Sequence, residues 1–269
     1  MKTLAYGCLP FLLLLGSCAI EQNYLMSPMD INSHPYAPLP MASDSLKAMT
    51  YGGLAFNIGS SNEGQRDRVA GVSVSVGRSH QFGNFQAYYS GNFNFGGYYF
   101  DVVETTYGYE KPARSYGGFG FNGGLNAVIP FGHGRGEWRF LGVETGYQQE
   151  FGQFFNYRKN LPDSLFDVNA VYRHAFRIGG STEIIGKTRH GTIIGYRFSA
   201  GVILYPPGTY IEHPGSYSDP TDLGNPFYAA HCLSFTRDRV TGYVQANIGV
   251  NAGGVQFGFI YRLSPKSKR

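Results

Sequence analysis

Few of the residues that could do acid–base or nucleophilic chemistry stand at catalytic spacing. The chain has seven histidines, of which His80, His133 and His190 lie in short polar stretches typical of solvated turns. No His-x-Ser pair occurs, and the nearest arrangement is His190-Gly191-Thr192. Cys232 follows His231, but neighbouring side chains on a strand point to opposite faces, so no thiol–imidazole pair is expected. We therefore predict no catalytic residues and a protein that is not an enzyme.

Two glutamates indicate an interior ion pair instead. Glu144 and Glu150 are six residues apart in a segment of strand-like alternation, so both side chains face the same side. If that side is the interior, each carboxylate needs a cationic partner, because an unpaired buried charge is costly. Arg197 is the candidate partner of Glu144. A salt bridge between Glu144 and Arg197 is the favoured interpretation, and a catalytic acid is the alternative.

The segment 206–227 carries polar and aromatic residues without a metal-binding pattern. Its acidic and imidazole side chains do not have the spacing of zinc or calcium ligands: Glu212, His213, Asp219 and Asp222. No metal and no cofactor are therefore predicted. Tyr210, Tyr217 and Phe227 are candidates for a recognition loop, because exposed aromatic residues often mark binding surfaces. An interfacial aromatic girdle of a membrane protein is the equal alternative.

The N-terminus has the features of a secretory signal. Lys2 precedes a mostly apolar run over residues 4–15, which is too short to span a bilayer. Leu15-Gly16-Ser17-Cys18 follows and resembles the bacterial lipobox. This resemblance implies that residues 1–17 are a lipoprotein signal peptide and that Cys18 is acylated. Cys8 would leave with the signal peptide, so Cys232 would remain without a disulfide partner in the mature chain.

The rest of the chain is organised as a tether, a barrel and a tail. Residues 18–45 are rich in Pro, Asn and Ser and are predicted to be an extended, lipid-anchored tether. Residues 46–263 alternate with period two, as in 70–77, where Val alternates with Ser and Gly. Residues 264–269 form a basic C-terminal tail. With a formal net charge of only +4 and no basic helix, the chain is not expected to bind nucleic acid.

The alternation predicts a closed antiparallel up-and-down transmembrane β-barrel. The bulky set of alternating residues is apolar, while the other set is mostly Gly, Ser, Asn and Gln. Charge is scarce, at 15% of all residues, so the small polar set fits a packed lumen and the apolar set fits a lipid-facing exterior. Closure leaves no unpaired backbone in hydrocarbon. A soluble, lipid-tethered barrel that binds an apolar ligand is the alternative.

The predicted number of strands is eight, with ten as the alternative. Eight segments are clear: about 46–59, 68–79, 84–100, 114–130, 136–150, 191–205, 240–250 and 253–263. Two further strands near 171–187 and 228–236 would restore the alternation of short periplasmic turns with long outer loops. The chain length slightly favours eight.

Together, the lipobox and the alternating glycine and aromatic residues resemble small outer-membrane β-barrel lipoproteins of Gram-negative bacteria. The resemblance covers most of residues 18–263 and implies a structural or protein-interaction role at the cell envelope. A lipid-modifying barrel enzyme is the alternative. The expected partners are outer-membrane lipid and another envelope protein that contacts loops 151–170 and 206–227. Cys18, both termini and the short turns are expected on the periplasmic side.

Overall fold

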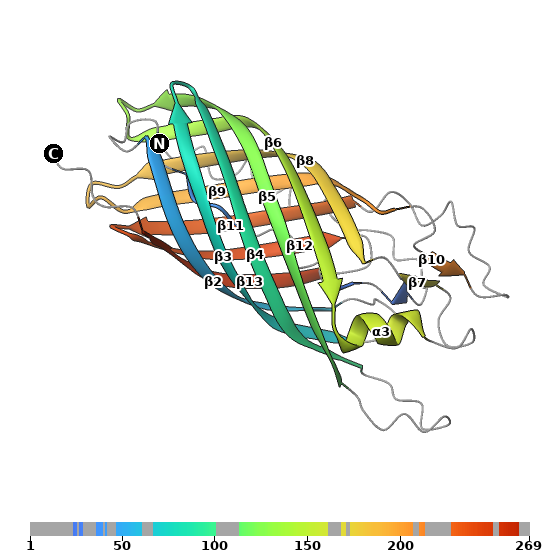
Figure 1. Ribbon diagram of the computed structural model, residues 1–269. Coiled ribbons are helices and arrows are strands. Elements are labelled where there is room, and N and C mark those ends of the chain that lie inside the picture. The colour runs from blue at the N-terminus through green and yellow to red at the C-terminus, as the bar shows by residue number, and fades with distance from the viewer. Residues whose placement is uncertain are drawn as a thin grey trace, which may run out of the picture.

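The computed structural model describes residues 24–25, 27–28, 36–39, 41, 47–60, 67–100, 113–160, 168–170, 173–206, 210–212, 227–249 and 253–263. Its main body is a closed barrel of strands (Figure 1). The strands follow the order β11-β12-β13-β2-β3-β4-β5-β6-β8-β9, and every neighbouring pair, including β9 with β11, is antiparallel. The predicted fold class is therefore confirmed.

The barrel has ten strands rather than eight, so the prediction of eight was wrong and the alternative was right. β8 and β11 are the two strands that the shorter count omitted, and each is joined to the next strand by a short turn. The bounds are β2 Ala48–Ser60, β3 Arg68–Phe82, β4 Phe85–Tyr99, β5 Ala113–Phe131, β6 Gly136–Phe151, β8 His174–Lys187, β9 Ile193–Leu204, β11 Phe227–Arg237, β12 Val240–Gly249 and β13 Gly253–Arg262.

Two ends of the barrel are distinguished by their connections. The short-turn end carries the turns 83–84, 132–135, 188–192 and 238–239, together with the start of β2 and the end of β13. Gly83 has a φ of 58°, and a Cβ there would meet nothing within 4 Å, so glycine is favoured by backbone conformation alone. The opposite end, here called the long-loop end, carries the connections 61–67, 100–112, 152–173 and 205–226, along with the short connection 250–252.

Short elements lie beside the barrel at the long-loop end (Figure 1). Helix α3, Gln153–Lys159, follows β6 directly, within the range 151–170 that was expected to be a loop. β7 (Val168–Ala170) pairs with β1 (Tyr24–Leu25) in parallel and with β10 (Tyr210–Glu212) in antiparallel orientation. Among the described residues, no helix is long and apolar enough to cross a membrane.

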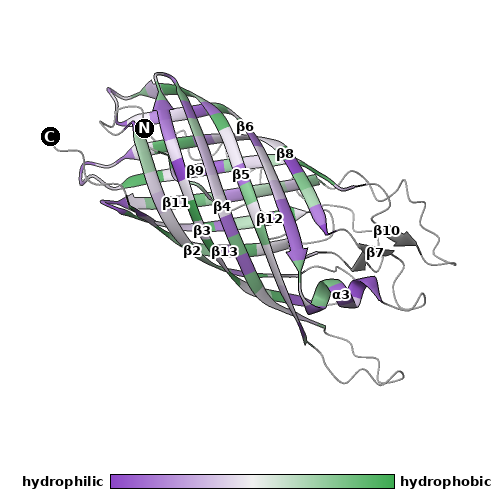
Figure 2. Cartoon of the chain, in the orientation of Figure 1, coloured by the Kyte–Doolittle hydropathy of each residue, from purple (hydrophilic) through white to green (hydrophobic). Residues whose placement is uncertain are grey.

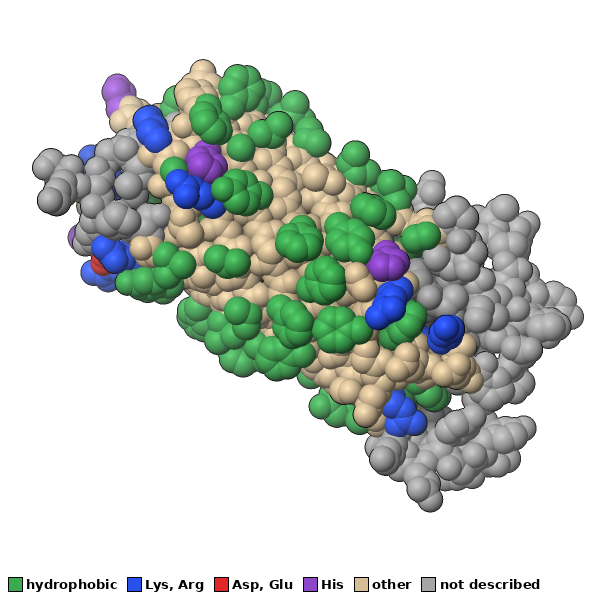
Figure 3. All heavy atoms as spheres, in the orientation of Figure 1, with side chains coloured by type: hydrophobic (Ala, Val, Ile, Leu, Met, Phe, Trp, Pro, Cys, Tyr) green, Lys and Arg blue, Asp and Glu red, His purple; other side chains and the backbone are tan. Residues whose placement is uncertain are grey.

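The two faces of the barrel wall differ as the alternation predicts. Hydrophilic and hydrophobic residues are interspersed along the strands (Figure 2). On β13, Phe257 is 46% exposed and Gln256 only 1%. On the face shown in Figure 3, hydrophobic side chains cover the middle of the barrel, and Lys, Arg and His side chains gather near its two ends. The exterior is thus apolar, whereas the wall residues that point inward are largely Ser, Asn, Gln, Glu and Arg.

Candidate functional site

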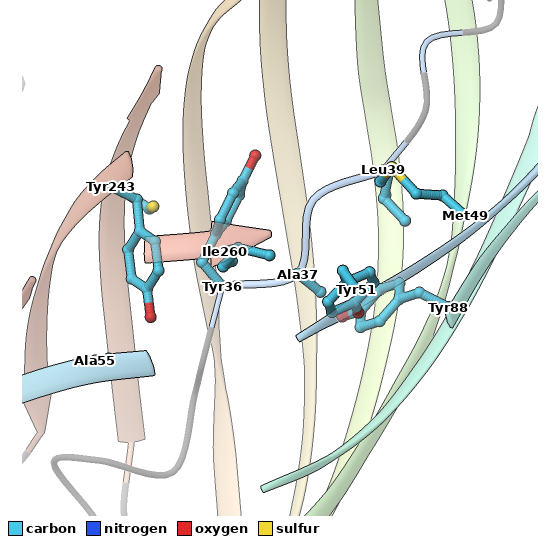
Figure 4. Close-up of a cluster of buried hydrophobic side chains, with 10 residues drawn as sticks. Tyr36, Ala37, Leu39, Met49, Tyr51, Ala55, Tyr88, Tyr243 and Ile260 are labelled. Atoms are coloured by element: carbon cyan, nitrogen blue, oxygen red, sulfur yellow. The ribbon is translucent and has the colours of Figure 1, made fainter. Parts of the chain in front are cut away.

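The most unusual feature of the barrel is a stretch of N-terminal chain inside it. Tyr36, Ala37, Leu39 and Met41 are all buried, and Figure 4 shows the segment passing between the strands. Tyr36 packs on Tyr243 of β12, with ring centroids 5.4 Å apart. The other members of this buried cluster come from four strands of the wall: Met49, Tyr51, Ala55, Tyr88, Cys232 and Ile260.

These contacts change the picture of residues 18–45. The sequence predicts an extended, lipid-anchored tether there, and the structure places residues 36–39 and 41 within the lumen. A proline-rich extended segment is narrow and leaves its backbone groups available, so polar side chains of a barrel wall can satisfy them. We refer to residues 27–41 as the inner segment; only 27–28, 36–39 and 41 of it are described.

Tyr36 joins the inner segment to the barrel wall through hydrogen bonds. Its hydroxyl donates to Glu183 Oε1 of β8 at 2.9 Å and lies 3.2 Å from Ser234 Oγ of β11. The phenol hydroxyl of Tyr36 is therefore the hydrogen-bond donor to the Glu183 carboxylate.

Arg139 of β6 is the centre of a buried charge network beside Tyr36. It forms ion pairs with both Glu137 and Glu183, and all three side chains are almost fully buried. Arg139 Nη2 also donates to the carbonyl oxygen of Leu39 at 3.1 Å. One guanidinium thus contacts two carboxylates and binds the backbone of the inner segment, which suits the several donors of its planar group.

A second network holds the inner segment at the long-loop end. The hydroxyl of Ser27 donates to the Glu150 carboxylate, which also forms an ion pair with Arg158 of α3. Next to Arg158 on α3, Phe154 is fully buried and stacks on Tyr98 of β4, with centroids 3.9 Å apart. Helix α3 therefore covers part of this end of the barrel.

Between these networks, the structure brings Glu144 and Arg197 together. Both side chains are buried and form an ion pair on the lumen side of the wall, where only β8 separates β6 from β9. Arg197 also donates to the hydroxyl of Tyr88 at 3.1 Å. A further arginine, Arg177 of β8, donates to Asn122 at 2.8 Å and lies over the ring of Tyr228. Charged and polar side chains therefore fill the middle of the lumen.

A cavity remains at the short-turn end, below the inner segment. Its volume is about 400 Å³, and Tyr36 and Leu39 form part of its wall. Apolar side chains such as Met49 and Ile260 line it together with the charged Arg239 and Arg262. This mixture does not match a closed apolar ligand site, in which polar groups are few.

The other residues singled out in the sequence are dispersed. Cys18 and Tyr217 lie outside the described residues, and Tyr210 belongs to β10. Phe227 is the first residue of β11 and is 51% exposed. Cys232 is a free, buried cysteine. Within the described ranges, no group of three or more His, Cys, Asp or Glu side chains could hold a metal ion.

Arg139, Glu183 and Tyr36 were missed in the sequence. A signal existed for Arg139, because Glu137 and Arg139 alternate with the aromatic residues Trp138 and Phe140, and charge in that register marks a lumen position. Tyr36 gave no signal, since a tyrosine in a proline-rich stretch has no periodic pattern around it.

Comparisons with known proteins locate the chain only at the level of its architecture. No family model matches it, and no curated protein matches it. Among solved structures, Neisserial surface protein A is 9% identical, with 81% of this chain and 98% of that chain covered and a TM-score of 0.36. The beta domain of a Bordetella autotransporter is 9% identical, with coverages of 81% and 100% and a TM-score of 0.45. An outer-membrane channel from Pseudomonas putida F1 is 7% identical, with coverages of 82% and 97% and a TM-score of 0.41. The similarity concerns barrel architecture and not an activity.

Proposed function

We propose that this protein is an outer-membrane β-barrel lipoprotein whose lumen is closed by its own N-terminal segment. Its role is structural or protein-interacting at the cell envelope, without catalysis. The observation that carries the proposal is the distribution of side chains, which is the reverse of that in a soluble protein. Apolar side chains cover the exterior, and ion pairs lie in the lumen. In lipid such an exterior is favourable, whereas in water a continuous apolar surface of this extent would drive aggregation.

The polar lumen argues against the alternative of a soluble carrier for an apolar ligand. Such a carrier needs its Phe and Tyr face inside, but Phe121 and Phe257 are 60% and 46% exposed on the outside. Inside, Glu144 and Arg197 occupy the volume that an apolar ligand would need. Binding there would separate a buried ion pair, at high cost.

Blockage of the lumen also argues against an open channel. The inner segment contacts the wall at both the Arg139 and the Glu150 networks, and the ion pair of Glu144 and Arg197 lies between them. We therefore assign the interaction role to the outer surface and to the long connections 151–170 and 206–227. The candidate partner is another envelope protein.

The contacts of two described histidines support a proposal without catalysis. His174 Nδ1 lies 2.7 Å from the hydroxyl of Tyr147, and His231 Nδ1 lies 2.7 Å from that of Tyr196. Each imidazole therefore contacts a weakly acidic phenol rather than a nucleophile with an orienting carboxylate, the arrangement that acyl transfer requires.

Labelling of single cysteines on intact cells tests the proposal. In a Cys232→Ser background, an impermeant thiol reagent should label Ser216→Cys and Asp163→Cys but not Gly134→Cys or Ser267→Cys, because long loops of bacterial barrels face outward. After permeabilisation all four should react. Labelling of all four on intact cells would show a surface-exposed soluble domain, and labelling of none would show a periplasmic one. Either result overturns the proposal.

A further inference from the structure

The inner segment runs through the barrel in one direction. That direction determines on which side of the membrane its first residue, Ser27, lies. Ser27 contacts Glu150, near the end of β6 that leads to α3. Leu39 contacts Arg139, near the other end of the same strand. The chain then enters β2 at the short-turn end. The inner segment therefore runs through the barrel from the long-loop end to the short-turn end.

The length of the chain agrees with this path. Eleven residues of β6 separate Arg139 from Glu150, which is about 36 Å along the strand. Twelve residues separate Ser27 from Leu39, and an extended chain of that length reaches about 40 Å. The two spans are similar, so a nearly extended segment suffices.

The strand pairing of β1 points to the same end independently. Tyr24 and Leu25 pair with Val168 and Asn169 of β7, in the connection between α3 and β8. β7 in turn pairs with β10, from the connection between β9 and β11. Both connections belong to the long-loop end, so Tyr24 and Leu25 are held there by strand pairing.

We propose that the N-terminal segment is threaded outward through its own barrel, so that lipidated Cys18 is anchored in the outer leaflet, on the cell-surface side. This inference rests on the proposed function, which supplies the lipidation and the outward orientation of the long loops. It reverses the expectation that Cys18 is held in the periplasmic leaflet.

The short distance from Cys18 to β1 excludes a return to the other leaflet. Six residues separate Cys18 from Tyr24, a reach of at most about 22 Å. The hydrocarbon core of a bilayer is about 30 Å thick, and unpaired backbone does not cross it in contact with lipid. The acyl chains of Cys18 therefore enter the leaflet that surrounds the long-loop end.

A single-cysteine probe close to β1 tests the threading on cells. Asn23→Cys in the Cys232→Ser background is compared with Ser216→Cys at the long-loop side and Gly134→Cys at the short-turn end. We expect Asn23→Cys to be labelled on intact cells together with Ser216→Cys, while Gly134→Cys reacts only after permeabilisation. If Asn23→Cys instead reacts only after permeabilisation, like Gly134→Cys, the threading is wrong although the barrel and its orientation stand. If all three react on intact cells, the membrane barrel itself is wrong and the inference fails with it.

A disulfide trap tests the path in purified protein, without reference to the cell. Ser27→Cys with Glu150→Cys, in the Cys232→Ser background, should form a disulfide on mild oxidation of the folded barrel. The matched control is Ser27→Cys with Glu137→Cys, at the short-turn end of the same strand, which should remain reduced. A disulfide of Ser27→Cys with Glu137→Cys but not with Glu150→Cys overturns the threading. This measurement also decides the case in which Asn23→Cys stays unlabelled under every condition.

Discussion

Tyr36 and Glu183 lie 147 residues apart in the sequence and share a hydrogen bond of 2.9 Å inside the barrel. The donor comes from the inner segment and the acceptor from β8, so this bond joins two parts of the chain that are positioned by different kinds of contact. Strand β8 is positioned by the backbone ladder of a closed sheet. The described part of the inner segment is bound by side chains of the wall, and the stability of those contacts decides whether the lumen stays closed.

The first prediction concerns Tyr36. Tyr36→Phe keeps the packing against Tyr243 but removes the hydrogen bond to Glu183, so we expect a loss of about 1–3 kcal/mol in the free energy of unfolding. Tyr36→Ala also removes the buried ring and should cost about 3–5 kcal/mol. Urea unfolding in detergent micelles measures both. Equal losses for the two variants would contradict the assigned packing of the ring.

The second prediction concerns Arg139. Arg139→Met leaves the buried carboxylates of Glu137 and Glu183 without their cation, so the barrel should lose about 3–5 kcal/mol of stability. Adding Glu137→Gln and Glu183→Gln should recover part of this loss, because no buried charge then remains unpaired. Arg135→Met is the control, since Arg135 is exposed in the turn 132–135 and should matter by less than about 0.5 kcal/mol. Unfolding curves that do not distinguish Arg139→Met from Arg135→Met would refute the network.

The third prediction concerns the ion pair of Glu144 and Arg197. A double-mutant cycle with Glu144→Gln and Arg197→Met should give a coupling free energy of about 1–3 kcal/mol, because each single variant leaves one buried charge without its partner. Refolding into lipid vesicles measures all four proteins. Additive effects of the two substitutions would mean that the side chains do not interact.

The fourth prediction concerns closure of the lumen. Deletion of residues 27–41 should produce conductance steps in planar bilayers, whereas the full chain should remain silent, because Leu39 and Ser27 of the inner segment contact the lumen wall at the Arg139 and Glu150 networks. Tyr36→Phe should also stay silent, since it retains the segment. Equal conductance of the full chain and the deletion variant would show that the inner segment does not block the barrel.

The sequence predicts the wall of this barrel far better than its contents. Alternation is a local property, because successive side chains on a strand face opposite sides whatever lies beyond them. The inward position of Glu144 and the outward position of Phe257 follow from it directly. The number of strands was harder to predict, because β8 and β11 contain Gly, Ser and Thr at positions that weaken the apolar pattern, as in Gly179-Gly180-Ser181.

The inner segment could not be predicted from local patterns. Its position depends on a proline-rich stretch meeting Arg139 and Glu183, which lie about 100 and 150 residues further along the chain. Composition predicts that the proline-rich stretch is extended. Composition carries no information on whether an extended segment lies outside a barrel or inside it.

The fifth prediction compares the two faces of β12 at neighbouring residues near its middle. Val244 is 43% exposed on the outside, while Gln245 is 1% exposed and donates to Asn247 in the lumen at 2.7 Å. Val244→Arg should destabilise the barrel by about 2–4 kcal/mol, because it places a charge in hydrocarbon near the midplane. Val244→Leu should change stability by less than about 0.5 kcal/mol.

The matched change at Gln245 should have the opposite pattern to that at Val244. Gln245→Leu introduces an apolar side chain among polar lumen groups and removes the hydrogen bond to Asn247, so we expect a loss of about 1–3 kcal/mol. Refolding into vesicles of fixed composition measures Val244→Leu and Gln245→Leu under identical conditions. Because leucine is suited to lipid and unsuited to a polar lumen, the sign of their difference depends only on which face is outside. A larger loss for Val244→Leu than for Gln245→Leu would therefore mean that the apolar face of β12 packs inward, and the transmembrane assignment would have to be abandoned.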